Sequence, residues 1–206
     1  MISKYSIFAK VYDLLILKFL GYQIAADFFI KHLPFGNFES MQVLDAGCGT
    51  GLYSFAILKR FPNAKIVAFD SNEEMLNQMK EKIKKFGKEN SVKVINADVL
   101  LPIPGINQQF DIIITGGVLE HVGIDDAIKN LSQHLKIGGY FLNAGVRNNF
   151  FGKTAGKFWG LKNLFSKNEL VEIFERYGFA LIRHMALPLK YFLARLAKEA
   201  YIFKKQ

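Results

Sequence analysis

A glycine-rich segment, VLDAGCGTG at residues 43–51, carries the pattern in this chain best suited to binding a reactive ligand. An apolar run ends at Asp45, and glycines follow at positions 47, 49 and 51. Such a turn between a strand and a helix presents backbone N–H groups and the helix N-terminus to a ligand. The dinucleotide fingerprint G-x-G-x-x-G needs its third glycine at position 52, which is Leu52 here.

The carboxylate of Asp45 indicates the charge of that ligand. A pyrophosphate would be repelled by Asp45, so the ligand should be cationic there and carry an anionic group for the helix end. S-adenosylmethionine has both features, because its amino group and sulfonium are positive and its carboxylate is negative. Asp45 and Leu52 therefore disfavour a nicotinamide oxidoreductase.

Two further carboxylates end the next two predicted strands. Asp70 lies 19 residues after Gly51 (70 − 51), where a carboxylate can accept hydrogen bonds from ribose hydroxyls. Asp98 is placed to accept the adenine amino group, and Met75 to pack on the adenine ring. Asp70 fits a nicotinamide cofactor equally well, so it does not discriminate between that cofactor and S-adenosylmethionine.

Short buried strands alternate with helices through the middle of the chain, which predicts a doubly wound α/β fold with a mostly parallel sheet. The predicted strands are Gln42–Asp45, Lys65–Asp70, Val92–Asp98, Phe110–Thr115 and Tyr140–Ala144, and the predicted helices are Leu52–Phe61, Glu73–Phe86 and Asp125–Leu135.

The two ends of the chain differ from this middle. Residues 3–33 predict two helices with aromatic stripes, and Ser166 with Glu169 predicts a capping box for a helix to Tyr177. A strand follows over Phe179–Met185, whereas residues 190–198 fit an edge strand or a short helix. We expect one domain over residues 1–206: a helical N-terminal cap (1–38), a cofactor-binding core (39–145), a substrate-lid insert (146–165), and a C-terminal helix with edge strands (166–206).

In this order the motifs resemble the class I S-adenosylmethionine-dependent methyltransferases, of the broad group that acts on small molecules, lipids and quinones. The segments that carry the resemblance are VLDAGCGTG (43–51), FDSNEEML (69–76), NADVLLP (96–102), FDIIITGGVLEHV (110–122) and LKIGGYFLNA (135–144), about half of the chain. The resemblance implies a Rossmann-like fold with a seven-stranded sheet, S-adenosylmethionine as donor and S-adenosylhomocysteine as product.

The resemblance also implies the role of each matching residue. Gly47, Gly49 and Gly51 would line the methionyl part of the cofactor, Asp70 would hold the ribose, and Asp98 would read the adenine. Ser71 departs from the larger apolar residue that usually covers the adenine. The cofactor-binding residues expected in this way are Asp45, Gly47, Cys48, Gly49, Gly51, Asp70, Ser71, Met75, Asp98, Val99 and Thr115.

The segment TGGVLEHVG, residues 115–123, is expected to border the transferred methyl group. His121 is the one histidine placed there, and we expect it to deprotonate or position the acceptor. A structural role, in which His121 ties the loop to the sheet, is the alternative. Glu120 with His121 is a thin ligand set, so no metal is expected.

Aromatic residues gather in the two capping regions and favour an apolar or ring-shaped acceptor, methylated by in-line displacement. They are Tyr5, Phe8, Tyr12, Phe19 and Tyr22 in one region, and Phe150, Phe151, Phe158 and Trp159 in the other. Lys153, Lys157 and Lys162 in the insert suit an acidic head group, a carboxylate or an anionic membrane surface.

Other classes of protein fit the sequence less well. The net charge of +9 suits nucleic acid, but Thr115-Gly116-Gly117-Val118 replaces the (Asp/Asn)-Pro-Pro-aromatic motif of amino-directed nucleobase enzymes. The single cysteine, Cys48, excludes an internal disulfide and a cysteine-based zinc site. An RNA methyltransferase and a catalytically silent cofactor-binding subunit stay as alternatives. No uninterrupted apolar run approaches the roughly 18 residues of a membrane span, so a cytoplasmic protein is expected.

Overall fold

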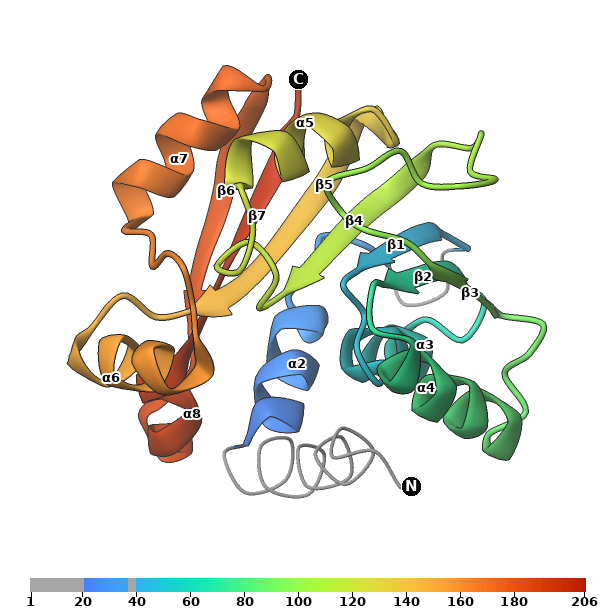
Figure 1. The fold of residues 1–206 in the computed structure, drawn as a ribbon, viewed down its shortest axis with the longest axis horizontal. Coiled ribbons are helices and arrows are strands. Elements are labelled where there is room, and N and C mark those ends of the chain that lie inside the picture. The colour runs from blue at the N-terminus through green and yellow to red at the C-terminus, as the bar shows by residue number, and fades with distance from the viewer. Residues whose placement is uncertain (1–20, 37–39) are drawn as a thin grey trace.

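The computed structural model describes residues 21–36 and 40–206, and its strands form one sheet in the order β3-β2-β1-β4-β5-β7-β6 (Figure 1). The strands β1 to β5 pair in parallel, and β7 is antiparallel to both β5 and β6. This arrangement confirms the predicted doubly wound fold. The strands are β1 (Gln42–Ala46), β2 (Lys65–Asp70), β3 (Val92–Asn96), β4 (Phe110–Gly116), β5 (Leu135–Val146), β6 (Phe179–Ala186) and β7 (Lys198–Lys205).

Helices cover both faces of the sheet (Figure 1). One apolar core lies between the sheet and α2, α3, α4 and α8, and a second lies between the sheet and α5 and α7. The described helices are α2 (Tyr22–Lys31), α3 (Leu52–Arg60), α4 (Glu73–Lys85), α5 (Ile124–Ser132), α6 (Phe150–Trp159), α7 (Lys167–Arg176), the short 3₁₀ helix η2 (Leu189–Tyr191) and α8 (Phe192–Ala197).

The central strands consist of apolar runs because both of their faces are buried. Ile112, Ile113 and Ile114 of β4 and Val43 and Leu44 of β1 are fully buried, although successive side chains point to opposite faces. Because β1 pairs in parallel with β2 and β4, the carboxyl ends of these three strands lie at one edge of the sheet. Ligands bind at this edge in open α/β sheets.

Several element boundaries differ from the predicted ones. β3 ends at Asn96, so Asp98 follows the strand. β5 begins at Leu135 rather than Tyr140, and the register shift between Phe110 and Ile112 of β4 accommodates the glycines at 138 and 139. The predicted capping box is present: Ser166 Oγ accepts from the Glu169 N–H, and Glu169 accepts from the Ser166 N–H.

The last part of the chain resolves the alternative that the sequence left open. Residues 189–197 are helical, and the following strand β7 lies between β5 and β6 instead of at an edge. β6 is the edge strand. Within the described part of the chain, no helix is long and apolar enough to span a bilayer.

Candidate active site

The glycine turn joins the carboxyl end of β1 to α3. Gly47, Gly49 and Gly51 have φ angles of +67°, +53° and +92°, a region that side-chain-bearing residues rarely adopt. The N–H of Cys48 donates to the carbonyl of Phe69 at 2.9 Å and fixes the turn to β2. A Cβ at Gly49 would meet no atom within 4 Å, whereas a Cβ at Gly47 would lie 2.3 Å from Cγ2 of Val118. Gly49 thus faces open space, and Gly47 faces the loop after β4.

Asp70 ends β2 beside this turn, as the sequence predicts. Its Oδ2 accepts a hydrogen bond from the Gly49 N–H at 2.8 Å, and its Oδ1 accepts one from the Asn72 N–H at 2.8 Å. Asn72 in turn caps α4 by accepting from the N–H groups of Glu74 and Met75. The ribose-binding candidate, the glycine turn and Met75 are therefore held in one connected network.

Asp45 lies behind the turn, with an exposed fraction of 1%. Its Oδ2 accepts hydrogen bonds from the N–H of Ser54 at 3.0 Å and from Ser54 Oγ at 2.6 Å, in the first turn of α3. Burial raises the pKa of Asp45 to about 6, against the hydrogen bonds from Ser54, and the charge of Asp70 adds to the rise. Contact between Asp45 and a cationic ligand group stays a prediction.

Three other predicted cofactor residues have buried side chains. Thr115 Oγ1 donates to Asn143 Oδ1 at 3.0 Å within the sheet. Burial raises the pKa of the Cys48 thiol, and Val99 packs in the core on the α5 side of the sheet. These residues can reach a ligand only through their backbone atoms.

At the predicted adenine end, the exposed Asp98 forms a turn. Its Oδ1 accepts from the Leu100 N–H at 2.9 Å, and the carbonyl of Val99 accepts from Asn130 Nδ2 at 2.9 Å. Ser71 is exposed and Met75 is half-buried. The side chains of Asp98, Ser71 and Met75 are thus accessible at the edge that Asp70 ends.

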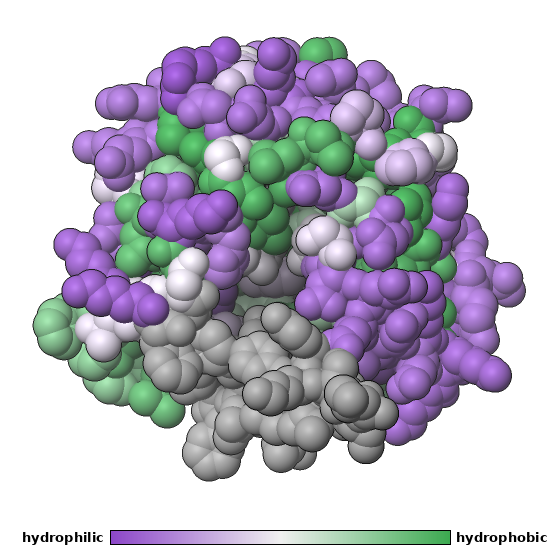
Figure 2. All heavy atoms as spheres, viewed as in Figure 1, coloured by the Kyte–Doolittle hydropathy of each residue, from purple (hydrophilic) through white to green (hydrophobic). Residues whose placement is uncertain are grey.

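The loop after β4 lies beside a hollow in the surface near the carboxyl end of β4 (Figure 2), and its position next to the methyl acceptor stays a prediction. The Gly117 N–H donates to the carbonyl of Ala144, and the His121 N–H donates to the carbonyl of Val118. The His121 side chain is exposed, and its ring forms no hydrogen bond with any residue that the structure describes. Backbone bonds rather than the imidazole hold this loop to the sheet.

Glu120 is a buried charged residue of this loop, with an exposed fraction of 3%. Its Oε1 accepts from the Val146 N–H at 2.5 Å, and its backbone carbonyl accepts from the N–H groups of Lys162 and Asn163. Oε2 is buried and has no hydrogen-bond partner in the described part of the chain. Glu120 therefore connects the loop to β5 and to the segment after α6. Residues 21–36 and 40–206 contain no group of three His, Cys, Asp or Glu side chains able to hold a metal ion.

Two residues near this edge, Ser54 and Lys198, were not predicted from the sequence. Ser54 is the partner of Asp45, and Lys198, at the start of β7, has an exposed fraction of 7% and lies over the ring of Tyr22. A serine early in a helix that follows an aspartate-ended strand is a signal for the first pair. Lys198 had no such signal, because β7 itself was not predicted.

Residues 37–178 match the family model described as a methyltransferase domain. The chain belongs to this methyltransferase family. The match covers most of the chain and includes the glycine turn, Asp70 and the loop after β4, which confirms the resemblance to the class I enzymes. The candidate cofactor residues lie at or near the carboxyl ends of the strands, and their contact with the cofactor stays a prediction.

Among curated proteins, the methyltransferase is 33% identical over 134 residues to a malonyl-[acyl-carrier protein] O-methyltransferase of Ilyobacter polytropus, covering 65% of this chain and 44% of that protein. It is 30% identical over 130 residues to a demethylmenaquinone methyltransferase of Leptospira interrogans, covering 62% and 52%. The chain thus spans about half the length of these relatives or less.

Among solved structures, the methyltransferase is similar to magnesium protoporphyrin IX methyltransferase from Synechocystis PCC 6803 with bound S-adenosylhomocysteine. The TM-score is 0.73 at 18% identity, and the alignment covers 91% of this chain and 84% of that one. This similarity confirms the fold.

Proposed function

We propose that the methyltransferase uses S-adenosylmethionine to methylate a small lipophilic acceptor by in-line displacement, with S-adenosylhomocysteine as the product. The observation that carries the acceptor class is an exposed apolar surface on α6, η2 and α8. The cofactor would supply an electrophilic methyl group on its sulfonium. The protein's own residues would bind both reactants, align them and exclude water.

The glycine turn and Asp70 fit the cofactor. The open side of Gly49 would admit the methionyl part, and Asp70 would accept hydrogen bonds from the ribose hydroxyls beside it. Asp45 would contribute its negative charge near the cofactor amino group from behind the turn. His121, exposed on the loop after β4, would take up or position the acceptor proton when the acceptor atom carries one.

The apolar surface is formed by exposed side chains of α6, η2 and α8. Five large apolar side chains are exposed on neighbouring elements, with fractions from 55% to 78%: Phe150 and Phe151 on α6, Leu189 on η2, and Phe192 and Leu193 on α8. The Asn149 Nδ2 group donates to the carbonyl of Leu196, which joins the start of α6 to α8. A contiguous apolar surface of this kind marks a binding or membrane-contact surface.

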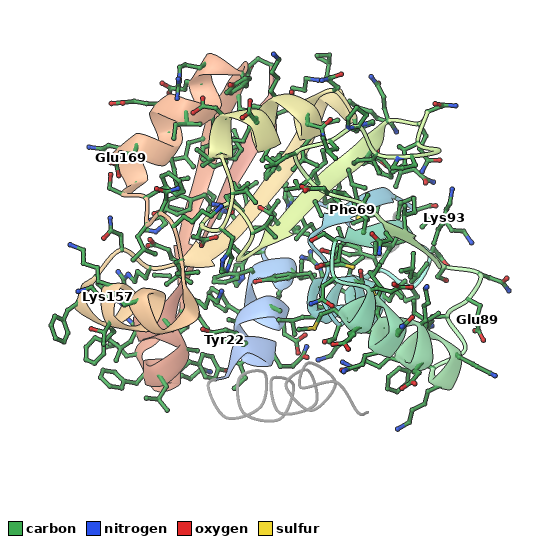
Figure 3. The ribbon with its side chains drawn as sticks, viewed as in Figure 1. Tyr22, Phe69, Glu89, Lys93, Lys157 and Glu169 are labelled. Atoms are coloured by element: carbon green, nitrogen blue, oxygen red, sulfur yellow. The ribbon has the colours of Figure 1, made fainter. Side chains whose placement is uncertain are left out.

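Basic residues border this surface. Lys153, Lys157 and Lys162 line one open groove together with Phe150 and Leu161. These three lysines form no ion pair with any described residue, and Lys157 is labelled on α6 in Figure 3. Apolar side chains flanked by unpaired lysines suit the surface of an anionic membrane, from which a lipophilic acceptor can enter.

Transfer of a radiolabelled methyl group from S-adenosylmethionine tests the acceptor class. We expect label in the organic phase of a bacterial lipid extract and none in purified RNA incubated in parallel. Label in RNA and not in lipid would contradict the proposal, and no label in either would favour a catalytically silent subunit.

Vesicle binding tests the membrane contact. We expect Lys153→Gln, Lys157→Gln and Lys162→Gln together to weaken co-sedimentation with vesicles that contain phosphatidylserine. The matched control changes Lys80, Lys84 and Lys85 on α4, which are exposed lysines with the same total charge. Equal binding by the two triple variants would contradict a specific contact through α6.

A further inference from the structure

Lys198 is a buried cation that the proposed reaction does not yet use. It is the first residue of β7 and pairs with Val146, the last residue of β5. With an exposed fraction of 7%, its side chain forms no hydrogen bond and no ion pair within residues 21–36 and 40–206. A buried ammonium without an anionic partner is unfavourable, so its retention needs a reason.

The ammonium of Lys198 lies at the acceptor edge of the sheet. Nζ is 4.7 Å from the ring centre of Tyr22, which lies at the start of α2 (Figure 3), and 3.5 Å from where a Cβ on Gly117 would be. Gly117 precedes Val118, the residue that packs against Gly47 of the glycine turn. The cation therefore touches the same short loop that contacts the proposed cofactor site.

The surroundings of Lys198 compensate its charge incompletely. Burial lowers the pKa of Lys198, and the negative charge of Glu120 opposes this change. Glu120 is not within ion-pair distance, and its Oε1 is used by the Val146 N–H. The face of the Tyr22 ring attracts the ammonium but accepts no conventional hydrogen bond from it. Within the described residues, the ammonium of Lys198, which has three donors, forms no hydrogen bond to an oxygen and contacts the Tyr22 ring instead.

We propose that Lys198 binds an anionic oxygen group, a carboxylate or a phosphate, on the methyl acceptor. This inference rests on the proposed function, because it concerns the acceptor of that reaction. The acceptor would then be an amphiphile whose charged end lies between Gly117 and Tyr22. Lys198 would be a specificity-determining residue, which fixes the orientation of the acceptor relative to the methyl donor.

Binding of simple amphiphiles to the complex with S-adenosylhomocysteine tests this inference. The probes are dodecanoate, dodecyl phosphate and dodecanol below their critical micelle concentrations, which share a chain and differ in charge. We expect wild-type protein to bind at least one anionic probe about tenfold or more tightly than dodecanol, as measured by calorimetry. Dodecanoate and dodecyl phosphate separate the two possible anions.

Two substitutions of Lys198 and a matched control complete the experiment. Lys198→Met should abolish the preference for the anion, and Lys198→Arg should keep it. The control is Lys204→Met on the same strand, because Lys204 also lies over a tyrosine ring, at 5.9 Å from Tyr140, but at the opposite end of β7. Lys204→Met should bind every probe as the wild type does.

Two results would overturn the inference. Equal wild-type affinity for anionic and neutral probes would do so without any variant, and so would a preference that survives Lys198→Met. If the wild type did not bind S-adenosylhomocysteine, the proposed function would be refuted. Failure of the inference and failure of the proposed function therefore give different results.

Discussion

The carboxylate of Asp70 accepts a hydrogen bond from the backbone N–H of Gly49 at 2.8 Å, which joins the end of β2 to the turn after β1. The proposed ribose-binding residue therefore also holds the turn that would contact the methionyl part of the cofactor. We expect Asp70→Ala to weaken S-adenosylhomocysteine binding about 10- to 100-fold, since a charged acceptor and an ordered turn are lost together. Calorimetry measures the affinity. Asp126→Ala, on the exposed surface of α5, is the control, and equal affinities of the two variants would refute the assignment.

Gly49 and Gly87 allow backbone strain to be separated from ligand contact. Both have positive φ, +53° and +61°, and a Cβ at either would meet no atom within 4 Å. Alanine at either position should therefore cost about 1 kcal/mol of unfolding free energy. Only Gly49→Ala should also weaken S-adenosylhomocysteine binding, because its methyl group would occupy the open side of the turn. Thermal unfolding and calorimetry of both variants check this, and equal affinities would place the cofactor elsewhere.

Asp45 should make the stability of the cofactor-free protein depend on pH. Its pKa of about 6 in the folded state lies above the ordinary 3.8, so the folded state holds the proton more tightly than the unfolded state does. The stabilisation from the protonated form is fully present below about pH 4 and is lost as the pH rises through about 6. The loss is about 3 kcal/mol, since one pKa unit corresponds to about 1.4 kcal/mol. Urea unfolding between pH 4 and 7 measures this change in unfolding free energy. In Asp45→Asn, the unfolding free energy should vary less with pH over the same range. Parallel pH profiles of the two proteins would contradict the buried position of Asp45.

His121 should affect turnover without affecting stability. Its ring is exposed and makes no hydrogen bond in the described part of the chain, so His121→Ala and His121→Gln should change the unfolding free energy by less than about 0.5 kcal/mol. Methyl transfer to the lipid extract should fall about 100-fold or more in both variants if the acceptor loses its proton to the imidazole. Wild-type turnover in both would remove His121 from the mechanism.

The sequence predicts the fold best where structure depends on contiguous residues. The apolar runs of β1, β2 and β4 are buried on both faces and predict these strands, and the spacing of Ser166 and Glu169 predicts the capping box. β7 was not predicted, because its apolar stretch, Ala200–Phe203, is short and its polar first residues are buried as well. The observed boundary differs from the predicted one where glycines distort a strand, as at the start of β5.

Some residues of the candidate site can likewise be predicted from a local motif, whereas others are brought together only by the fold. The glycine turn and Asp70 follow one another closely along the chain, so a local motif places them together. Tyr22, Glu120 and Lys198 come from three distant segments and meet only because β7 enters the sheet beside β5. No pattern within one segment predicts such a cluster. Likewise, the position of Asp45 behind the turn depends on its partner Ser54 in the next helix.

The position of β7 between β5 and β6 has a consequence for how the chain assembles during synthesis. β6 is made before β7 but cannot join the sheet without it, because β7 supplies the hydrogen bonds on both sides. The half of the sheet formed by β1 to β5 can therefore acquire its order as the ribosome advances, whereas the β6–β7 half is sealed only after residue 205 has emerged. In a nascent chain, the residues of the proposed cofactor site would therefore be in place before Lys198 completes the proposed acceptor site.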